Sequence, residues 1–251
     1  FTACAPKELF PDEKLVKVCE KIASENDCKI TLTEDVVLTT PLEVVGKLTL
    51  NLNGKTLSAI DNTSKNYSLI DNRGDLTITG EGVMTVEATV NSGWNRYSAV
   101  IANNPGGKLI IESGLIEHLG GTDMAYGIDN LTNGKGTSAI TTINGATVKS
   151  TYRAIRQFLN GIEATNELYV KAGSTILNTT GTNKGIWMQD PSKNANTAID
   201  KFTTDANQAI QDAQSGGAAG GEEGGGEVVV PPVSTPKDEG EDNDDEVGGD
   251  D

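Results

Sequence analysis

The sequence predicts an all-β protein built as a β-solenoid, a chain wound into about five stacked coils of short strands. Three observations predict this fold. The 251 residues include 29 glycines but only 4% aromatic residues, a composition that suits turns and strands better than a thick globular core. A strand–glycine–strand motif recurs along the chain, and a second motif that begins with tyrosine recurs out of phase with it.

The first motif reads L-x-(I/V/L), followed by a turn glycine and a second short strand. It occurs as LTLNLNGKTL (48–57), LTITGEGVMTV (76–86), LIIESGLIEHL (109–119), ITTINGATV (140–148) and LYVKAGSTIL (168–177). Its turn glycines, spaced 28, 32, 31 and 28 residues apart, are Gly54, Gly82, Gly114, Gly145 and Gly173. We expect the first aliphatic residues to point inward and stack as a ladder formed by Leu48, Leu76, Leu109, Ile140 and Leu168.

The second motif occurs as YSLIDN (67–72), YSAVIANN (97–104), YGIDN (126–130), YRAIRQFLN (152–160) and, in degenerate form, KGIWMQD (184–190). Its asparagines are expected at corners with a left-handed backbone, with amides that hydrogen-bond to the next coil; they are Asn72, Asn103, Asn130 and Asn160. Two motifs sharing a period near 30 residues favour parallel stacking over an antiparallel sandwich or a propeller.

The solenoid is predicted over residues 29–193, with a short capping helix at each end. Residues 1–28 form the N-terminal segment, in which Pro11–Asp27 has the apolar spacing of an amphipathic helix. Strands then follow over Lys29–Val45, broken at Glu34-Asp35 and Thr40-Pro41.

A second helix is predicted over residues 194–214, either as a cap or as an oligomerisation element. Its apolar stripe has the spacing of a short coiled coil and consists of Ile199, Phe202, Ala206, Ala209 and Ala213. Residues 215–251 follow as a glycine-rich linker and an acidic tail. Within that tail, VVVPPV is predicted to add a strand or an extended strip to a neighbouring protein.

The charge of the chain is concentrated at its C-terminal end. The formal net charge is −16, and the stretch from Gln214 to Asp251 contributes −11 of it, with twelve acidic residues and one lysine. No basic patch suggests a nucleic-acid partner, and no apolar run is long enough for membrane insertion.

The repeat segments resemble a known family. LTEDVVLTTPLEVVGKLTLNLNGKTL, DLTITGEGVMTV and GGKLIIESGLIE are similar to coils of right-handed parallel β-helix proteins of the pectate-lyase-like type. Such coils occur in bacteriophage head fibres and tailspikes and in bacterial surface proteins. The resemblance covers roughly residues 29–190 and implies the fold, because the shared residues are those that a coil requires.

The sequence predicts no catalytic residues, no metal site and no cofactor. Hydrolases of the family carry clustered aspartates with His-Gly and Arg-Ile-Lys signatures, which this chain lacks, and His118 is interpreted as an ordinary coil residue. Acidic and basic residues at similar places in successive coils could still align on one face, although each also suits a solvated turn; they are Asp71, Asp129, Asp190, Arg153 and Arg156. Cys19 and Cys28 either pair in an oxidising compartment or are buried thiols.

Exposed aromatic residues beside amide and charged groups are typical of glycan or partner contacts. The candidates are Trp94, Asn95, Arg96 and Tyr97 in the VNSGWNRYS loop, together with Trp187 in the last coil. The structural alternative is that Trp94 folds back over its coil and that Trp187 packs under the terminal helix.

These features predict a non-enzymatic structural protein on a virion surface, either a β-helical head fibre or a capsid-decorating protein of a bacteriophage. Its expected partners are other virion or capsid proteins, further copies of itself, with a trimer suggested by family resemblance, and host-surface glycans. The alternatives are a tailspike-like polysaccharide lyase or hydrolase and an adhesin on a bacterial cell surface.

Overall fold

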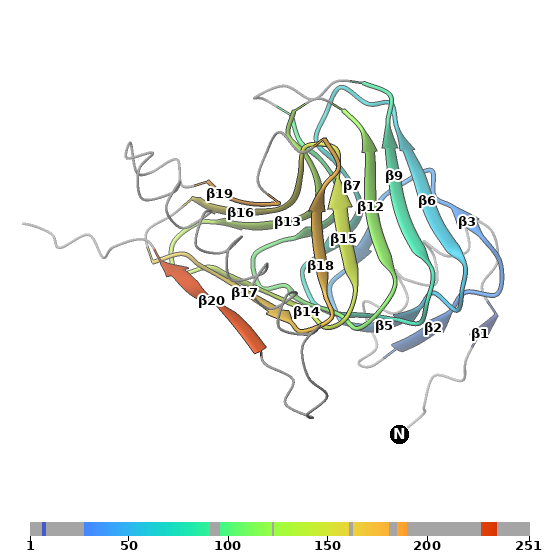
Figure 1. The fold of residues 1–251 in the computed structure, drawn as a ribbon, viewed down its shortest axis with the longest axis horizontal. Coiled ribbons are helices and arrows are strands. Elements are labelled where there is room, and N and C mark those ends of the chain that lie inside the picture. Colours follow the sequence, from blue (N-terminus) through green and yellow to red (C-terminus); the bar gives the residue numbers. More distant parts are fainter. Residues whose placement is uncertain are drawn as a thin grey trace, which may run out of the picture.

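The chain forms a parallel β-solenoid of about five coils (Figure 1). The described residues form strands and turns but no helix, and none of them therefore forms a helix that could cross a membrane. Each full coil gives one strand to each of three sheets, named A, B and C here. The computed structural model describes residues 7–8, 28–90, 96–121, 123–160, 163–180, 185–189 and 227–234.

Sheet A has eight strands, all parallel to their neighbours except the last one, which pairs antiparallel. In spatial order they are β1 (Lys7–Glu8), β2 (Cys28–Thr31), β5 (Lys47–Asn51), β8 (Asp75–Thr79), β11 (Lys108–Ile111), β14 (Ser138–Ile143), β17 (Thr165–Lys171) and β20 (Glu227–Ser234).

Sheets B and C have six strands each. Sheet B contains β3 (Val36–Val37), β6 (Thr56–Asp61), β9 (Val83–Ala88), β12 (Leu115–Gly120), β15 (Thr147–Ser150) and β18 (Thr175–Asn178). Sheet C contains β4 (Leu42–Val44), β7 (Tyr67–Asn72), β10 (Ser98–Asn103), β13 (Ala125–Asn133), β16 (Arg153–Asn160) and β19 (Ile186–Gln189).

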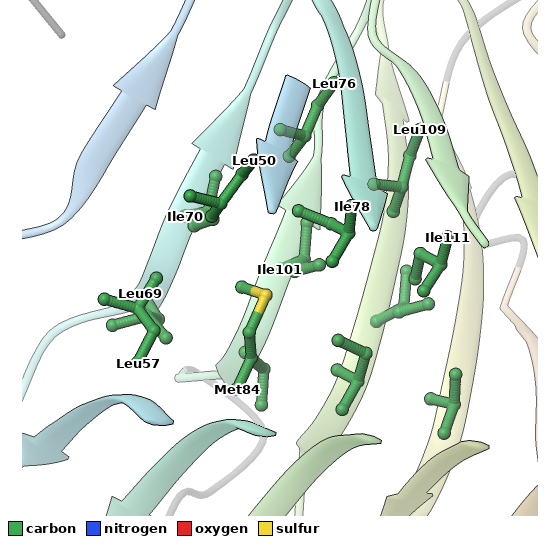
Figure 2. Close-up of a cluster of buried hydrophobic side chains, with 14 of the residues drawn as sticks. Leu50, Leu57, Leu69, Ile70, Leu76, Ile78, Met84, Ile101, Leu109 and Ile111 are labelled. Atoms are coloured by element: carbon green, nitrogen blue, oxygen red, sulfur yellow. The ribbon is translucent and has the colours of Figure 1, made fainter. Parts of the chain in front are cut away.

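The predicted stacking of one coil on the next is confirmed. Leu48 pairs with Leu76, and Leu50 pairs with Ile78. Sheet C contributes a continuous inward row of aliphatic side chains, in which each member pairs with the same position of the next coil. The row consists of Leu42, Ile70, Ile101, Ile128, Ile155 and Ile186. Figure 2 shows how such rows from the three sheets meet and fill the interior, where burial of apolar surface stabilises the stack.

One member of the predicted leucine ladder is wrong. Leu109 pairs with Thr141, which in turn pairs with Leu168, so Thr141 and not Ile140 occupies the inward position. Ile140 is half-buried on the other side of its strand, because a shift of one residue moves a side chain to the opposite face. Thr141 is tolerated inside because its hydroxyl oxygen lies 3.1 Å from Asn130 Oδ1 and 3.1 Å from Asn103 Nδ2.

The predicted asparagine ladder is confirmed for three of its four members. Asn72 Nδ2 donates to Asn103 Oδ1 at 2.8 Å, and Asn103 Nδ2 donates to Asn130 Oδ1 at 2.9 Å. Asn160 does not continue this row, because Gln157 pairs with Asn130 while Asn160 pairs with Asn133, three residues further along the strand. Its amide still donates to the neighbouring coil as predicted, from Nδ2 to Asn133 Oδ1 at 3.1 Å.

The expected left-handed backbone at these asparagines is also wrong. Among the non-glycine residues described, positive φ occurs only at Asn53, Met124 and Glu163. The ladder asparagines instead lie within or at the ends of sheet C strands with their amides buried. The left-handed corner is formed by Asn53-Gly54, with φ values of 50° and 74°, which fits the tolerance of both residue types for that region.

The breaks expected within Lys29–Val45 are present, since β2, β3 and β4 are separated by residues 32–35 and 38–41. Both predicted helices and most of the acidic tail lie outside the described residues. VVVPPV lies in β20 and pairs with β17 of its own chain, so the structure shows the predicted strand addition within the chain and leaves addition to a neighbouring protein a prediction.

Candidate functional site

The candidate site lies on the outer face of sheet C towards the C-terminal end of the solenoid. Inward and outward side chains alternate at the inward row of this sheet, and the outward row beside it carries charged residues at four of its six positions. The row consists of Glu43, Asp71, Ala102, Asp129, Arg156 and Trp187. Nearer the strand starts this alternation is interrupted, since consecutive residues such as Leu69 and Ile70 both lie in the core. A second outward row therefore precedes them and contains Ser68, Ala99, Tyr126 and Arg153.

The centre of the site is an ion pair between Arg156 and Asp129. Arg156 Nε donates to Asp129 Oδ1 at 2.8 Å, and Nη2 donates to Oδ2 at 2.5 Å. The exposed fractions of the two side chains are only 3% and 0%. A buried charge is tolerated when it is paired and hydrogen-bonded in this bidentate manner, so the guanidinium is held rigidly against β13.

Aromatic rings surround this guanidinium. Its carbon lies 4.7 Å from the ring centre of Tyr126, 4.9 Å from that of Phe158 and 5.3 Å from that of Tyr97. Distances below about 6 Å place a cation within the range of attraction by a ring quadrupole. Arg156 therefore both fixes the strands and orients the rings around it.

A second arginine lies between two further rings. The guanidinium carbon of Arg153 is 4.6 Å from the ring centre of Trp187 and 5.2 Å from that of Tyr152. Within the described residues, Arg153 Nε has no hydrogen-bond partner. Arg153, Tyr152 and Trp187 are each half-buried, so this part of the site offers a cation and aromatic faces together.

Tyr126 joins the two arginines. Its ring centre is 6.4 Å from that of Trp187, nearly stacked at 27°, and 6.1 Å from that of Tyr152, in an edge-on arrangement. Tyr126 is fully buried, and its hydroxyl lies 3.0 Å from Met124 Sδ. Met124 has a φ of 53°, which is uncommon for a bulky residue and indicates a backbone constrained at this edge of the site.

We name this set the aromatic–arginine cluster; it consists of Tyr97, Tyr126, Tyr152, Arg153, Arg156, Phe158 and Trp187, with Asp129 beneath them. Burial, together with the negative charges of Asp129 and Asp71, raises the pKa of Tyr97 to about 12. Burial also raises the pKa of Tyr126. Burial lowers the pKa of Arg156, but the charge and hydrogen bonds of Asp129 outweigh burial and raise it. Near neutral pH Tyr97 and Tyr126 therefore keep their hydroxyl protons, and Arg156 is a cation.

The structure divides the sequence-predicted binding residues. Tyr97 and Trp187 belong to the aromatic–arginine cluster, but Tyr97 directly precedes β10 and Trp187 lies in β19, three strands away in sheet C. Trp94 and Asn95 lie outside the described residues. Arg96 is buried, with 7% of its side chain exposed, and donates to Asp61 and to the carbonyl of Lys65. Contact of each of these residues with a glycan stays a prediction.

Arg96 belongs to a buried polar cluster between sheets B and C. Ser98 Oγ donates to Asp61 Oδ2 at 2.6 Å and lies 2.9 Å from His118 Nε2. Asp61, Ser98 and His118 are at most 1% exposed. Burial, assisted by the nearby charge of Arg96, lowers the pKa of His118 to about 4, against the opposing influence of Asp61. A histidine, a serine and an aspartate thus meet, but in the interior, where a substrate has no access.

The residues expected to align on one face do so in part. Asp71, Asp129 and Arg156 share the outward row, whereas Arg153 lies in the second row and Asp190 lies outside the described residues. Asp129 is engaged by Arg156 on both oxygens, and Asp71 accepts a hydrogen bond from Ser68 at 2.6 Å. Within the described residues, no three His, Cys, Asp or Glu side chains converge as a metal site would require.

Sequence reasoning missed the roles of Tyr126, Tyr152 and Phe158. Arg156 follows Asp129 by 27 residues, the same interval that separates the paired residues Asn103 and Asn130. That interval was the available signal for opposite charges on neighbouring strands. Tyr97, Tyr126 and Tyr152 each begin the second motif, which indicated one tyrosine per coil. They do not occupy one register row, so the motif did not indicate that their rings converge with Phe158 and Trp187.

Comparisons with known proteins assign no family to the chain. No protein-family model matches it, and no solved structure matches it. A short stretch is 54% identical over 33 residues to an ornithine carbamoyltransferase of Haemophilus influenzae, covering 13% of this chain and 10% of that enzyme. Another match, to a catabolic ornithine carbamoyltransferase of Treponema denticola, is 56% identical over 36 residues and covers 14% and 11%. The chain thus spans about a tenth of the length of these enzymes, so the similarity carries no activity to it.

Proposed function

We propose that this chain is a non-enzymatic structural protein of a bacteriophage particle, either a head fibre or a capsid-decorating protein, which contacts host-surface glycans. The resemblance of its coils to those of bacteriophage head fibres and tailspikes supports the virion assignment. The observation that carries the binding role is the aromatic–arginine cluster on the outer face of sheet C.

The chemistry of the cluster suits a sugar. Half-buried aromatic faces stack against the apolar faces of pyranose rings, while guanidinium and phenol groups donate hydrogen bonds to hydroxyl oxygens. The rings of Tyr152 and Trp187 stand nearly perpendicular, at 86° and 6.3 Å between centres, and Arg153 lies against both. Two rings and a donor in a fixed arrangement favour a rigid ligand over a flexible one.

Glycan binding is tested by applying the whole chain to an array of bacterial surface glycans and measuring the affinity of any ligand found. We expect Trp187→Ala to weaken binding at least tenfold. The matched control is Tyr169→Ala, which also removes a half-buried aromatic ring, but from β17 of sheet A and not from sheet C, where the cluster lies. Equal affinities for Trp187→Ala and the unmodified chain would remove the cluster from the proposal.

The virion assignment is tested separately. Mass spectrometry of purified particles from the source of this sequence is expected to find the chain at a fixed ratio to the major capsid protein. Particles that lack it would refute the assignment while leaving glycan binding to be judged by the array.

A polysaccharide lyase or hydrolase is the second candidate function, because Asp71 and Asp129 share one outward row. The bidentate engagement of Asp129 by Arg156 weakens this candidate, since a general base must be available to take a proton. Incubation with the glycans that the array identifies, followed by assays for reducing ends and unsaturated products, distinguishes cleavage from binding alone.

A further inference from the structure

The last strand of sheet A differs from every other strand pairing in the three sheets. The described pairings between successive coils are all parallel, but β20 pairs antiparallel with β17. It therefore does not continue the coil. It returns along the edge that the final coil leaves at the end of the sheet (Figure 1).

The edge of β17 needs such cover. The strand spans Thr165–Lys171, seven residues, whereas the final strands of sheets B and C, β18 and β19, span four each. A long edge presents a row of unpaired N–H and C=O groups on which another strand can form a ladder. Of the three final strands, β17 thus offers the longest template, and it is the one that β20 covers.

The register of β20 against β17 shows how this strand accommodates two prolines. Val228, Val229 and Val230 pair in order with Val170, Tyr169 and Leu168. The pairing then shifts, so that Val233 lies opposite Asn166, and Pro231-Pro232 fall in the irregular step between. Prolines cannot donate to a ladder, but a bulge requires no donor there.

The same prolines end the sheet. A further strand could add to β20 only by accepting hydrogen bonds from the N–H groups on the outer edge of β20. Two consecutive prolines leave at least one such N–H missing, because neighbouring residues of a strand direct their N–H groups to opposite edges. The sequence beyond β20, KDEGEDNDDE, is strongly acidic, so another copy of this chain approaching that edge meets like charge.

The edge of β17 fits one partner in particular, a second copy of the same chain. At the opposite end of sheet A, β1 covers β2 over two residue pairs only, Lys7–Ile30 and Glu8–Thr31. Each coil of the solenoid pairs in parallel with the next coil. The first coil of one copy could therefore pair in the same way with the last coil of another copy. Such a head-to-tail contact does not close on itself and builds a filament.

We propose that β20 is an edge guard: by pairing with β17 it prevents end-to-end association of this solenoid with a second copy of itself. Residues 190–226 connect β19 to β20 within one chain, so β20 is covalently tethered to the edge that it covers. Tethering of this kind gives an effective concentration in the millimolar range. β20 of the same chain therefore outcompetes a second copy at micromolar concentration.

The test uses the full chain with Val228→Pro and Val229→Pro together. Of two consecutive residues in β20, one directs its N–H group towards β17 and the other directs it away. Replacing both Val228 and Val229 with proline therefore removes one hydrogen-bond donor to β17. The control, Val228→Thr with Val229→Thr, keeps both donors and the β-branched shape. Sedimentation velocity is measured from 1 to 100 μM for all three proteins, with hydrogen exchange of the amides of residues 165–171 measured alongside.

We expect the unmodified chain and the threonine control to keep a constant sedimentation coefficient. The proline variant should show faster exchange in β17 and a weight-average mass that rises at least twofold over the concentration range. Adding the peptide EVVVPPVS in excess should reverse that rise. Faster exchange without any rise in mass would overturn the proposal, and so would unchanged exchange, because β20 would then not protect the edge.

Discussion

Arg156 and Asp129 lie directly opposite each other on neighbouring strands of sheet C, joined by two hydrogen bonds of 2.8 and 2.5 Å. The pair is buried beneath aromatic rings on what would otherwise be a solvent-facing surface of the solenoid. The charge of each side chain offsets the free-energy cost of burying the charge of the other. Removing one partner should therefore destabilise the fold more than removing both.

Replacing Arg156 with methionine leaves the Asp129 carboxylate buried without its partner. We expect a loss of about 3–5 kcal/mol in the free energy of unfolding, measured by urea denaturation. The control is Lys149→Met, which breaks the half-buried pair of Lys149 with Glu117 on sheet B and should cost about 1 kcal/mol or less. The double variant Arg156→Met with Asp129→Leu should recover most of the loss, and a double variant as unstable as the single one would contradict this account.

His118 makes the stability of the fold depend on pH. Its pKa is about 4 in the folded chain and ordinary, near 6.5, in the unfolded chain. The unfolded state therefore binds more protons between these values, so stability is complete above about pH 6.5 and falls towards pH 4, by up to about 3 kcal/mol.

Urea midpoints measured from pH 7.5 to 4.5 test this dependence. In His118→Gln the decline over that range should be markedly shallower, since glutamine does not titrate. Carboxylates contribute similarly to both proteins and cancel in the comparison. Parallel declines in the two proteins would show that another group carries the pH dependence.

Gln157 marks the end of the asparagine ladder. Within the described residues, both polar atoms of its buried amide have no hydrogen-bond partner, and such groups cost about 1–3 kcal/mol each time they are left unpaired. We expect Gln157→Leu to raise the free energy of unfolding by about 1 kcal/mol. The matched substitution Asn103→Leu should lower it by about 2 kcal/mol, because it removes the hydrogen bonds that Asn103 makes with the buried amides of Asn72 and Asn130. Opposite signs in thermal or urea unfolding are the required result.

Gly74 lies where two coils approach each other closely. A Cβ at this position would lie 2.1 Å from the carbonyl oxygen of Gly46 and 2.7 Å from the carbonyl carbon of Val45. Because both atoms belong to the backbone, Gly74→Ala should cost at least about 2–3 kcal/mol. At Gly136, φ is +65° and nothing lies within 4 Å of an added Cβ, so Gly136→Ala should cost only about 1 kcal/mol. Similar costs would show that the coils separate easily at this corner.

Much of the fold could be predicted because a solenoid repeats its requirements. The glycines of the first motif all have positive φ, from 74° at Gly54 to 152° at Gly82, and the same local need produces the same residue in each coil. The misassignment of Ile140 has a physical reason as well. Both Ile140 and Thr141 suit a strand, and only the hydrogen bonds from the neighbouring coil make Thr141 acceptable inside.

The candidate site was harder to predict because it depends on side-chain directions in several coils at once. Tyr126 lies opposite Arg153 in register, and Arg156 lies opposite both Asp129 and Trp187. The two outward rows meet around the same rings, because the consecutive residues between them, such as Ala154 and Ile155, both lie in the core. No single motif in the sequence contains that convergence, although most of its members stand in the second motif.

The asparagine row has a consequence for how the chain finds its structure. Leucine and isoleucine accept almost any aliphatic neighbour, so coils that stacked two residues out of step, or skipped one another, would still cover their apolar surface. The amides of Asn72, Asn103 and Asn130 are satisfied only when each coil follows its proper predecessor. The row therefore raises the free energy of mis-stacked arrangements, in which buried amides lose their partners, and so favours one order and register of the coils in a repetitive chain.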